Sequence, residues 1–297
     1  MTALLVGLDL GGTKSAVRAS TLDGRVVVDA VVPSTDWDAE PVASGVAWVQ
    51  ALLAAQMPPG ATITALGIGA QGLDTAGIAR EFEHALATLG HRARCVNDAA
   101  LLVPAAGLVS GIGLISGTGA IGVGADAAGD PLITGGWGWV IGDEAGAAGI
   151  VREATRAALR AHDDGHPDDG LLGGLCAAFA VDGAERLARA VNDEPTMENW
   201  GRAAPAVFAA ADAGSALAST VIENAARHLA RLVDQLVRRG AAGTDVVAAG
   251  SVIVGQPRLF SALVRLVGER HPSFTVHLLT EPPVAGALAL ARQLHPA

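Results

Sequence analysis

The sequence predicts an α/β protein of two similar lobes, because one glycine-rich hairpin pattern occurs in it twice. The first copy is the turn Asp9-Leu10-Gly11-Gly12-Thr13-Lys14, and the second is Ser116-Gly117-Thr118-Gly119. A further turn, at Gly24 or Gly129, follows each copy at the same interval. At 297 residues the chain also exceeds the usual size of one domain. A repeated hairpin in a chain of this length predicts two copies of one folding unit.

The first lobe, expected over residues 1–108, consists of three strands followed by alternating helices and strands. Apolar runs bounded by turn residues indicate strands, and apolar residues at helical spacing indicate helices. The expected strands are Leu4–Leu10, Ser15–Ala19, Arg25–Val32, Ile63–Ile68 and Arg94–Val96, and the expected helices are Ala43–Gln56 and Ala76–Leu89. Paired strands followed by crossover helices predict a mixed sheet.

The second lobe, expected over residues 109–297, begins with the repeated hairpin at about 111–133 and then becomes mostly helical. One helix is expected to hold Asp143 and Glu144 in its first turn, where carboxylates interact favourably with the helix dipole, and to run to about Ala161. The other expected elements are the helices Ala216–Arg239 and Pro283–Leu294 and the strands Asp245–Ala249 and Phe274–Leu279.

The composition excludes several classes of function. The formal net charge is −10, which argues against a nucleic-acid or anionic-membrane partner, since either would need a basic surface. No run of about 18 apolar residues indicates a membrane span, and no signal peptide precedes the first strand. The only cysteines, Cys95 and Cys176, allow no disulfide framework, so a reducing cytoplasm is the expected location.

The two glycine turns are expected to bind phosphate. Glycine lets backbone N–H groups approach an anion closely, because no Cβ intervenes. Lys14, in the first turn, is the only lysine in a chain whose other basic residues are arginines. A compact ammonium at this position suits a phosphate group, although chance retention of one lysine is the alternative.

Two aspartates at the ends of predicted strands are candidates for chemistry. Asp9 ends the first strand beside its glycine turn, where a carboxylate can hold Mg²⁺ near bound phosphates; a turn-capping role is the alternative. Asp98 follows the strand Arg94–Val96, at the sheet edge where α/β proteins bind ligands. Asp98 is either a helix cap or the carboxylate that phosphoryl transfer to an alcohol needs beside the attacking hydroxyl.

The segment Gly135-Gly136-Trp137-Gly138-Trp139 and the following Gly142-Asp143-Glu144 form a candidate sugar loop. Acidic side chains accept hydrogen bonds from sugar hydroxyls, and aromatic rings stack on the C–H face of the sugar. A packed turn with core tryptophans is the alternative. Two other patterns are set aside: Gly117–Gly122 matches a dinucleotide fingerprint but continues as a hairpin, and His162–Asp169 is a solvated loop, not a metal site.

Taken together, these motifs resemble the N-acetylglucosamine kinases of the BadF/BadG/BcrA/BcrD branch of the actin-like, hexokinase and Hsp70 ATPase superfamily. The resemblance spans nearly the whole chain. It rests on Asp9–Thr13, Asn97-Asp98, Ser116–Gly119, Gly135–Gly138, Gly142–Glu144 and Ala249-Gly250-Ser251, which occur in this order. It implies two ribonuclease-H-like lobes with a nucleotide cleft between them, and a final helix at about 283–294 that crosses back to the first lobe.

The resemblance also implies roles for single residues, with ATP and Mg²⁺ as cofactors. Asp9 would serve Mg²⁺, and Asp98 would be the base on the sugar 6-hydroxyl. Phosphate and adenosine would be bound by Gly11, Gly12, Thr13, Lys14, Ser116, Gly117, Thr118, Gly119, Gly250 and Ser251. The sugar would be bound by Asp36, Gln71, Asp98, Gly136, Trp137 and Asp143.

Some positions depart from the family pattern. Leu10 replaces a common glycine in the first turn, and Ser251 replaces a common glycine in the adenosine turn. Asp36 stands where these kinases often place Asn, and Gln71 where a small hydroxyl residue is common. Both of the latter changes touch the sugar, so the expected substrate is an amino sugar, N-acetylglucosamine first and glucosamine or N-acetylmuramic acid as alternatives. A homodimer is one expectation for the assembly, because dimers are frequent among the resembling kinases.

Two hypotheses from other classes remain. Members of this branch also act as ATP-driven activators of reductases through an iron–sulfur cluster held by cysteines at a dimer interface. Cys95 in a strand and Cys176 in a helix do not suit that role. A sugar or nucleotide sensor without catalysis would have no need of Asp98.

Overall fold

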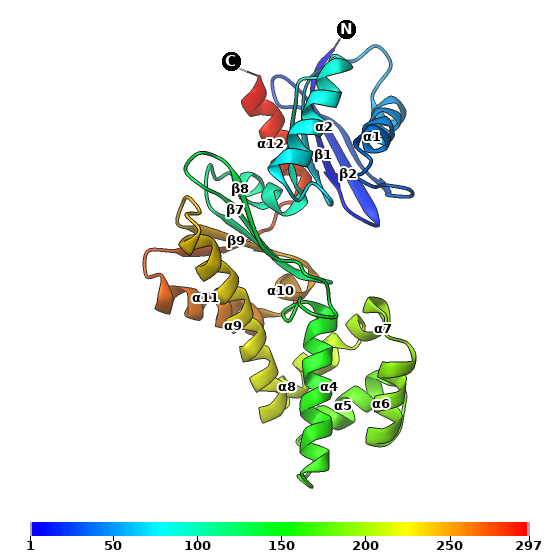
Figure 1. Cartoon of the computed structure of the whole chain (residues 1–297), viewed down its shortest axis with the longest axis vertical. Helices are drawn as coiled ribbons and strands as arrows, with labels where there is room; N and C mark the ends of the chain where they lie inside the picture. Colours follow the sequence, from blue (N-terminus) through cyan, green and yellow to red (C-terminus); the bar gives the residue numbers. More distant parts are fainter. Residues whose placement is uncertain (1, 296–297) are drawn as a thin grey trace.

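The computed structural model describes residues 2–295 and shows two lobes, each built on a five-stranded sheet (Figure 1). The first sheet has the order β3-β2-β1-β4-β5 and the second the order β8-β7-β6-β9-β10. In both sheets the first three strands along the chain are antiparallel neighbours, and the next two join in parallel. The duplication predicted from the repeated hairpin is therefore present in the topology.

The strands lie close to their expected positions. Those of the first sheet are β1 (Ala3–Leu10), β2 (Lys14–Thr21), β3 (Val26–Pro33), β4 (Thr62–Ala70) and β5 (Ala93–Asn97). Those of the second sheet are β6 (Ile112–Ser116), β7 (Ala120–Ala125), β8 (Pro131–Gly135), β9 (Asp245–Ala249) and β10 (Thr275–Leu278). Since β7 follows the second glycine turn directly, that turn opens a strand and not the helix that a dinucleotide fingerprint needs.

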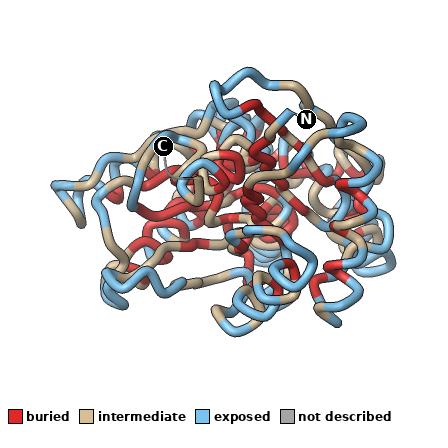
Figure 2. Tube along the Cα trace, turned by 90° about the horizontal axis from the view of Figure 1, so that it is seen from above, coloured by how far each residue is buried: buried red, intermediate tan, exposed pale blue. Residues whose placement is uncertain are grey.

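In the first lobe, helices α1 (Val42–Gln56) and α2 (Ala76–Thr88) cover the sheet, and η1 (Asp98–Leu101) and α3 (Leu102–Ala105) follow β5. Helix α2 begins after Thr75, whose side chain accepts a hydrogen bond from the Ile78 N–H at 3.2 Å. Buried side chains of both helices pack on the apolar strands β1 and β4. Seen from above, the buried segments lie in the interior of the molecule and the exposed segments lie around them (Figure 2).

The last helix, α12 (Val284–Leu294), packs on strands β1 and β4 of the first lobe, so both chain ends lie in that lobe (Figure 1). Its Leu288 and Ala291 form a buried cluster with Leu5 of β1 and Ala65 of β4. The approach is close because the strands present glycine there: a Cβ at Gly67 would lie 1.8 Å from the carbonyl oxygen of Ala287.

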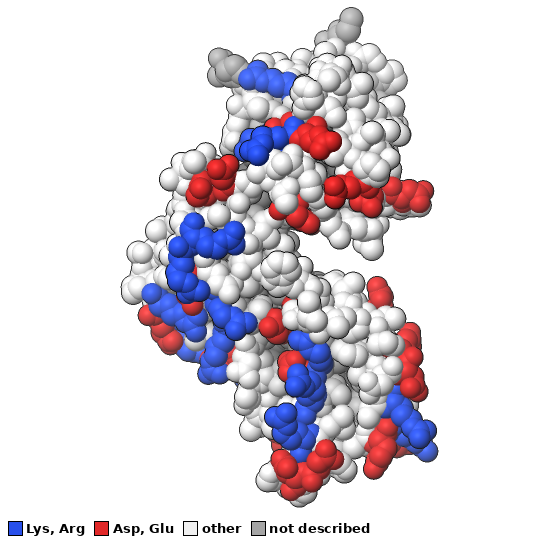
Figure 3. Space-filling model, in the orientation of Figure 1, with Lys and Arg blue, Asp and Glu red and all other residues white. Residues whose placement is uncertain are grey.

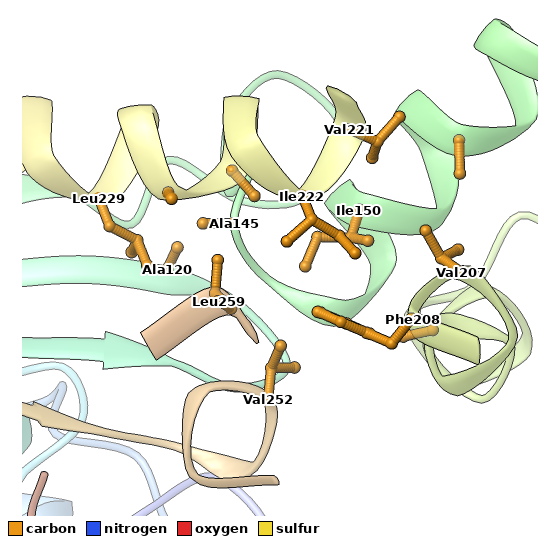
Figure 4. Close-up of a cluster of buried hydrophobic side chains, with 14 of the residues drawn as sticks. Ala120, Ala145, Ile150, Val207, Phe208, Val221, Ile222, Leu229, Val252 and Leu259 are labelled. Carbon is orange, nitrogen blue, oxygen red and sulfur yellow. The ribbon is translucent and has the colours of Figure 1, made fainter. Parts of the chain in front are cut away.

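The helices of the second lobe cover its sheet and extend away from it, with α4 and α5–α8 at the far end (Figure 1). They are α4 (Ala147–Asp163), α5 (Leu171–Phe179), α6 (Gly183–Asp193), α7 (Met197–Gly201), α8 (Ala204–Asp212), α9 (Ala216–Arg238), α10 (Ser251–Gly255) and α11 (Pro257–Arg270). Ile150, Ile222 and Leu229 lie in a core that α4 and α9 form over the sheet (Figure 4).

The start of α4 differs from the sequence prediction. The helix begins at Ala147, so Asp143 and Glu144 precede it and do not occupy its first turn. Asp143 has a φ of 54°, a left-handed conformation that a helix cannot contain. A favourable charge for the helix dipole was outweighed by the loop's need to turn at this residue.

The structure bears on the predicted loop 162–169 and on the search for a membrane span. In the polar loop after α4, Asp168 accepts hydrogen bonds from the N–H groups of Gly170, Leu172 and Gly173 at 2.8–3.0 Å, so its carboxylate supports the start of α5. Within residues 2–295, no single helix is long and apolar enough to cross a membrane. One pair bent by 118°, 197–212 with 216–238, passes the same test by length and composition alone.

Candidate active site

The first glycine turn connects β1 to β2 and holds its tip open to solvent. The Gly11 N–H donates to the Lys14 carbonyl at 3.1 Å, while Gly12, Thr13 and Lys14 are exposed. A Cβ at Gly12 would lie 2.6 Å from Oε1 of Gln71, so the Gln71 side chain lies directly against this turn. The structure therefore brings Gln71 to the first glycine turn.

Asp9 near the end of β1 and Asp98 just after β5 lie at the same edge of the first sheet, with β4 between their strands. Burial, with the negative charge of Asp98 added, raises the pKa of Asp9 from 3.8 to about 7. Burial also raises the pKa of Asp98, and the nearby charge of Asp74 adds to that rise. A buried carboxylate whose pKa is raised favours a proton or a cation beside it.

Asn97 and Asp74 position Asp98. The Asn97 side-chain oxygen accepts from the Ala99 N–H at 2.9 Å and so caps η1, while its amide donates to Asp74 at 2.8 Å. Asn97 is thus the N-cap residue of η1, and Asp98 Oδ1 accepts from the same Ala99 N–H at 2.9 Å. Asp74 was missed from the sequence, although its place just after β4, at the carboxyl edge of the sheet, could have indicated it.

Asp98 also lies where the two lobes meet. It begins η1, which packs on β6 of the second lobe, and a Cβ at Gly113 would lie only 2.6 Å from the Ala99 carbonyl oxygen. Figure 3 shows the surface hollowed between the first lobe and the helices of the second. Strands β1 and β2 reach toward this hollow from one side, and α4 starts on the other (Figure 1).

In the second lobe, the turn 116–119 touches the turn that begins α10. Gly250 has a φ of 104°, and a Cβ there would lie 2.4 Å from the Ser116 carbonyl oxygen. Ser116 is fully buried, and its hydroxyl donates to the Ala145 carbonyl at 2.7 Å, so its side chain holds the loop in place. Thr118 and Ser251 are the exposed hydroxyl residues of the two turns.

The sugar loop is held by one tryptophan and exposes the other. Trp139 packs edge-on against Trp200 of α7, with ring centroids 4.8 Å apart, whereas the side chain of Trp137 is 75% exposed. Arg152 of α4 donates to the carbonyl oxygens of Trp139 and Gly142, the second at 3.2 Å. Arg152 and Trp200 thus hold the loop on its buried side, and the indole of Trp137 is exposed on the other. The role of Arg152 was not predicted from the sequence.

Asp143 is buried below this loop with an unsatisfied oxygen. Its Oδ1 has no hydrogen-bond partner among the described residues, while the Ala120 N–H donates to its carboxylate. Burial, with the charge of Glu144 added, raises the pKa of Asp143. A Cβ at Gly119 would lie 2.7 Å from Oδ2, so the second glycine turn and the candidate sugar loop are in direct contact.

Asp36 is not joined to this group. It lies in an exposed turn after β3 with a φ of 61°, and Trp37 beside it packs on Trp48 at 5.2 Å. No hydrogen bond or ion pair within residues 2–295 connects Asp36 to the other candidates. Its part in substrate binding therefore stays a prediction.

The described residues contain no group of three or more His, Cys, Asp or Glu side chains arranged to hold a metal ion. Asp9 alone nevertheless suits Mg²⁺, which usually keeps several waters and takes only one or two protein carboxylates beside substrate phosphates. Cys95 and Cys176 are both buried, Cys95 in the first lobe and Cys176 in the second.

The chain was compared with protein families, with curated proteins and with solved structures. The model of the BadF/BadG/BcrA/BcrD ATPase family matches residues 6–289. The comparison with curated proteins finds no match. Among solved structures, a candidate N-acetylglucosamine kinase from Chromobacterium violaceum is 24% identical with a TM-score of 0.70, over 97% of this chain and 98% of that one.

Two further structures share the fold at lower similarity. A candidate N-acetylglucosamine kinase from Porphyromonas gingivalis is 18% identical with a TM-score of 0.63, over 97% of this chain and 99% of that one. A ROK family glucokinase from Streptomyces griseus, in complex with glucose and AMPPNP, is 17% identical with a TM-score of 0.54, over 97% and 98%. At these identities the likeness supports the two-lobe fold.

Proposed function

Because this chain belongs to the BadF/BadG/BcrA/BcrD ATPase family, we propose that it transfers the γ-phosphoryl group of ATP to the 6-hydroxyl of an amino sugar. N-acetylglucosamine is the first candidate substrate. The observation that carries the proposal is Asp98: a buried carboxylate with a raised pKa, beside Asp9, at the junction of the lobes. A base for an alcohol works best when its pKa is raised toward the operating pH.

In the proposed mechanism, Asp98 accepts the proton of the attacking hydroxyl. Asp9, with water, would hold Mg²⁺, which supplies charge neutralisation for the transferring phosphoryl group. The structural support for this assignment is that burial, with the charge of Asp98 added, raises the pKa of Asp9, since a cation bound there would stabilise the ionised carboxylate. Asn97 would keep Asp98 in place by capping η1.

The two glycine turns would hold the phosphates from opposite lobes. The tip of the first turn, with Gly12, Thr13 and Lys14 exposed, offers backbone N–H groups and one ammonium. The second turn offers Thr118 and the glycines on either side of it, and it contacts Gly250 and Ser251. These contacts support a nucleotide site shared between both sheets.

The sugar would lie against the loop 135–144. The unpaired Oδ1 of Asp143 can accept a hydrogen bond from a sugar hydroxyl, and a buried acceptor without a partner is otherwise costly. The exposed Trp137 supplies an apolar face for stacking, and Gly136 supplies backbone groups. The alternatives in this fold are glucosamine phosphorylation, a reductase-activating ATPase and a sugar sensor.

An ATP-consumption screen tests the proposal directly. Glucosamine, N-acetylglucosamine, N-acetylmuramic acid, N-acetylmannosamine and glucose would each be supplied with ATP and Mg²⁺, and the phosphorylated product identified by mass. We expect turnover with an amino sugar and little with glucose. ATP hydrolysis independent of any sugar would contradict the kinase assignment, and absence of turnover with every sugar would favour the sensor.

We predict that the lobes close when both ligands bind. The proposed contacts are divided between the lobes, with Asp9, Thr13 and Asp98 on one and Thr118 and Asp143 on the other. A ligand that bridges both lobes binds the closed form better and so increases its population. Small-angle scattering should show a smaller radius of gyration with sugar and a non-hydrolysable ATP analogue together. An unchanged radius would argue against closure.

Asp36→Asn should separate the two leading substrates. A carboxylate at the 2-position of the sugar would favour the ammonium of glucosamine, and such a contact is worth about 1.5–3 kcal/mol, or roughly 10–100-fold in kcat/KM. The variant should then lose kcat/KM mainly on glucosamine and little on N-acetylglucosamine. Equal losses on both sugars would mean that Asp36 accepts from a hydroxyl. Asp38→Asn, an exposed neighbour, serves as control.

A further inference from the structure

A second, arginine-rich groove lies in the second lobe, between α4 and α9. Its volume is about 890 Å³, within the range of small-molecule sites. Six arginines line it, against three carboxylates: Arg156, Arg160, Arg227, Arg231, Arg238 and Arg270. Figure 3 shows basic side chains gathered over these helices. In a chain with a net charge of −10, this is a local excess of cations.

Four of these arginines form two pairs of like charges at helical spacing. Arg156 and Arg160 on α4, and Arg227 and Arg231 on α9, lie four residues apart on one helix face. Like charges at this spacing destabilise a helix. Carboxylates offset part of the charge, as in the pair Arg156–Glu153 at 3.4 Å, but no ion pair of the described residues engages Arg160 or Arg238. The arrangement favours an anion in the groove.

The groove reaches the sugar loop through three residues. A smaller cavity of about 140 Å³ lies under the loop, lined by Trp137 and Asp143 among others, and it shares Glu144, His228 and Arg231 with the groove. Glu144 lies 3.3 Å from Nδ1 of His228 and 3.6 Å from the guanidinium of Arg231. The residue next to Asp143 is therefore held from the groove side.

The hold on Glu144 is weak. Arg231 donates to Nδ1 of His228 at 2.9 Å, which makes Nδ1 an acceptor and leaves the proton on Nε2. That Nε2 is buried without a partner, on a side chain only 9% exposed. With Nδ1 an acceptor, His228 gives Glu144 no hydrogen bond, and Arg231 is shared between the two. An anion that binds Arg231 more strongly can therefore replace His228 and Glu144 as its partner.

We propose that this groove is a second anion site, which binds the phosphate group of a small phosphorylated molecule on Arg231, with Arg156 and Arg227 nearby. Guanidinium groups match phosphate oxygens in bidentate geometry. None of the described lining residues is Phe or Trp, and arginines are the most numerous residues of the lining. Binding would draw Arg231 from Glu144 and shift the loop that holds Asp143; this last step rests on the proposed function.

The test is calorimetric titration of the whole chain with inorganic phosphate and, separately, with N-acetylglucosamine 6-phosphate. A non-hydrolysable ATP analogue with Mg²⁺ is kept at saturation to fill the nucleotide cleft. Arg231→Gln should weaken phosphate binding by about tenfold or more, since a charge-assisted hydrogen bond is worth that much. Arg156→Gln should weaken it several-fold. Arg189→Gln, on the exposed face of α6, should bind as the wild type does.

Absence of phosphate binding, or equal affinity in both groove variants and the wild type, would overturn the site. Tighter binding of the sugar phosphate than of phosphate would identify the reaction product as the ligand, and equal binding would identify free phosphate. Amide hydrogen exchange of residues 136–144 should change with phosphate in the wild type but not in Arg231→Gln; no change in either would overturn the link to the sugar loop. Neither readout needs turnover, so a failed kinase assignment leaves both interpretable.

Discussion

Asp98→Asn is expected to lower kcat by about 10²–10⁴, the usual loss when a positioned general base is removed. The change is nearly isosteric, and an amide oxygen can still accept the Ala99 N–H that Asp98 accepts at 2.9 Å. Binding of ATP and of the sugar should therefore change little. The measurement is steady-state turnover with ATP and the best sugar, together with calorimetric binding of each ligand.

Stability separates a catalytic loss from a structural one. Burial raises the pKa of Asp98 in the folded state, so its ionised form is disfavoured by folding and destabilises the protein above that raised pKa. The neutral asparagine should leave the melting temperature at pH 7–8 unchanged or slightly higher. A variant that kept more than a tenth of the wild-type kcat would place the base elsewhere.

Two further variants serve as comparisons. Asp74→Asn removes the neighbouring charge, which lowers the pKa of Asp98 but keeps its carboxylate, so we expect a loss of less than tenfold. Asp130→Asn makes the same chemical change in the exposed hairpin of the second lobe and should have no effect. A loss with Asp74→Asn as large as that with Asp98→Asn would argue for a shared role of both carboxylates.

The duplicated architecture could be predicted because short sequence patterns specify its elements. The glycine turns, the apolar runs before them and the helical stripe of α9 each specify an element from neighbouring residues alone. The start of α4 was wrong for the converse reason. At Asp143 the tertiary contacts with Gly119 and the Ala120 N–H determine the backbone, and local charge preference does not.

The candidate-site residues at strand ends could be predicted from the sequence. The supporting residues on helices distant in the sequence could not. Asp9 lies near the end of β1 and Asp98 follows β5, both strands that the sequence shows, so the sheet places both residues at one edge. Arg152, His228 and Arg231 support the sugar loop from α4 and α9, and nothing in their spacing relates them to it. Such contacts depend on how helices pack across the sheet.

Gly67→Ala is expected to destabilise the first lobe, because α12 rests on the backbone of β1 and β4. The new Cβ would lie 1.8 Å from the Ala287 carbonyl oxygen and 2.9 Å from the Ala291 nitrogen, both helix backbone atoms that cannot rotate away. Overpacking of this kind costs about 1–3 kcal/mol and sometimes more. In a chain of this size we expect a melting temperature lower by roughly 5–10 °C.

Gly77→Ala is the matched control, since a Cβ there meets nothing closer than 3.7 Å and alanine favours the helix α2 that contains it. Limited proteolysis supplies a second measurement. A displaced α12 should expose the segment 279–283 to cleavage in Gly67→Ala and not in Gly77→Ala. If both variants melt and cleave like the wild type, the helix is able to move outward without loss.

A second glycine, Gly7 of β1, tests whether α12 is displaced as a rigid unit. Gly7 is the neighbour of Gly67 across the β1–β4 ladder, and a Cβ at Gly7 would lie 2.4 Å from the Leu288 nitrogen. Both substitutions push the same helix in the same direction, so one displacement relieves both clashes. Gly7→Ala/Gly67→Ala should therefore cost clearly less than the two single costs added together. Additive costs would mean that each glycine acts on its own strand, and that α12 is not held as a rigid unit against the sheet.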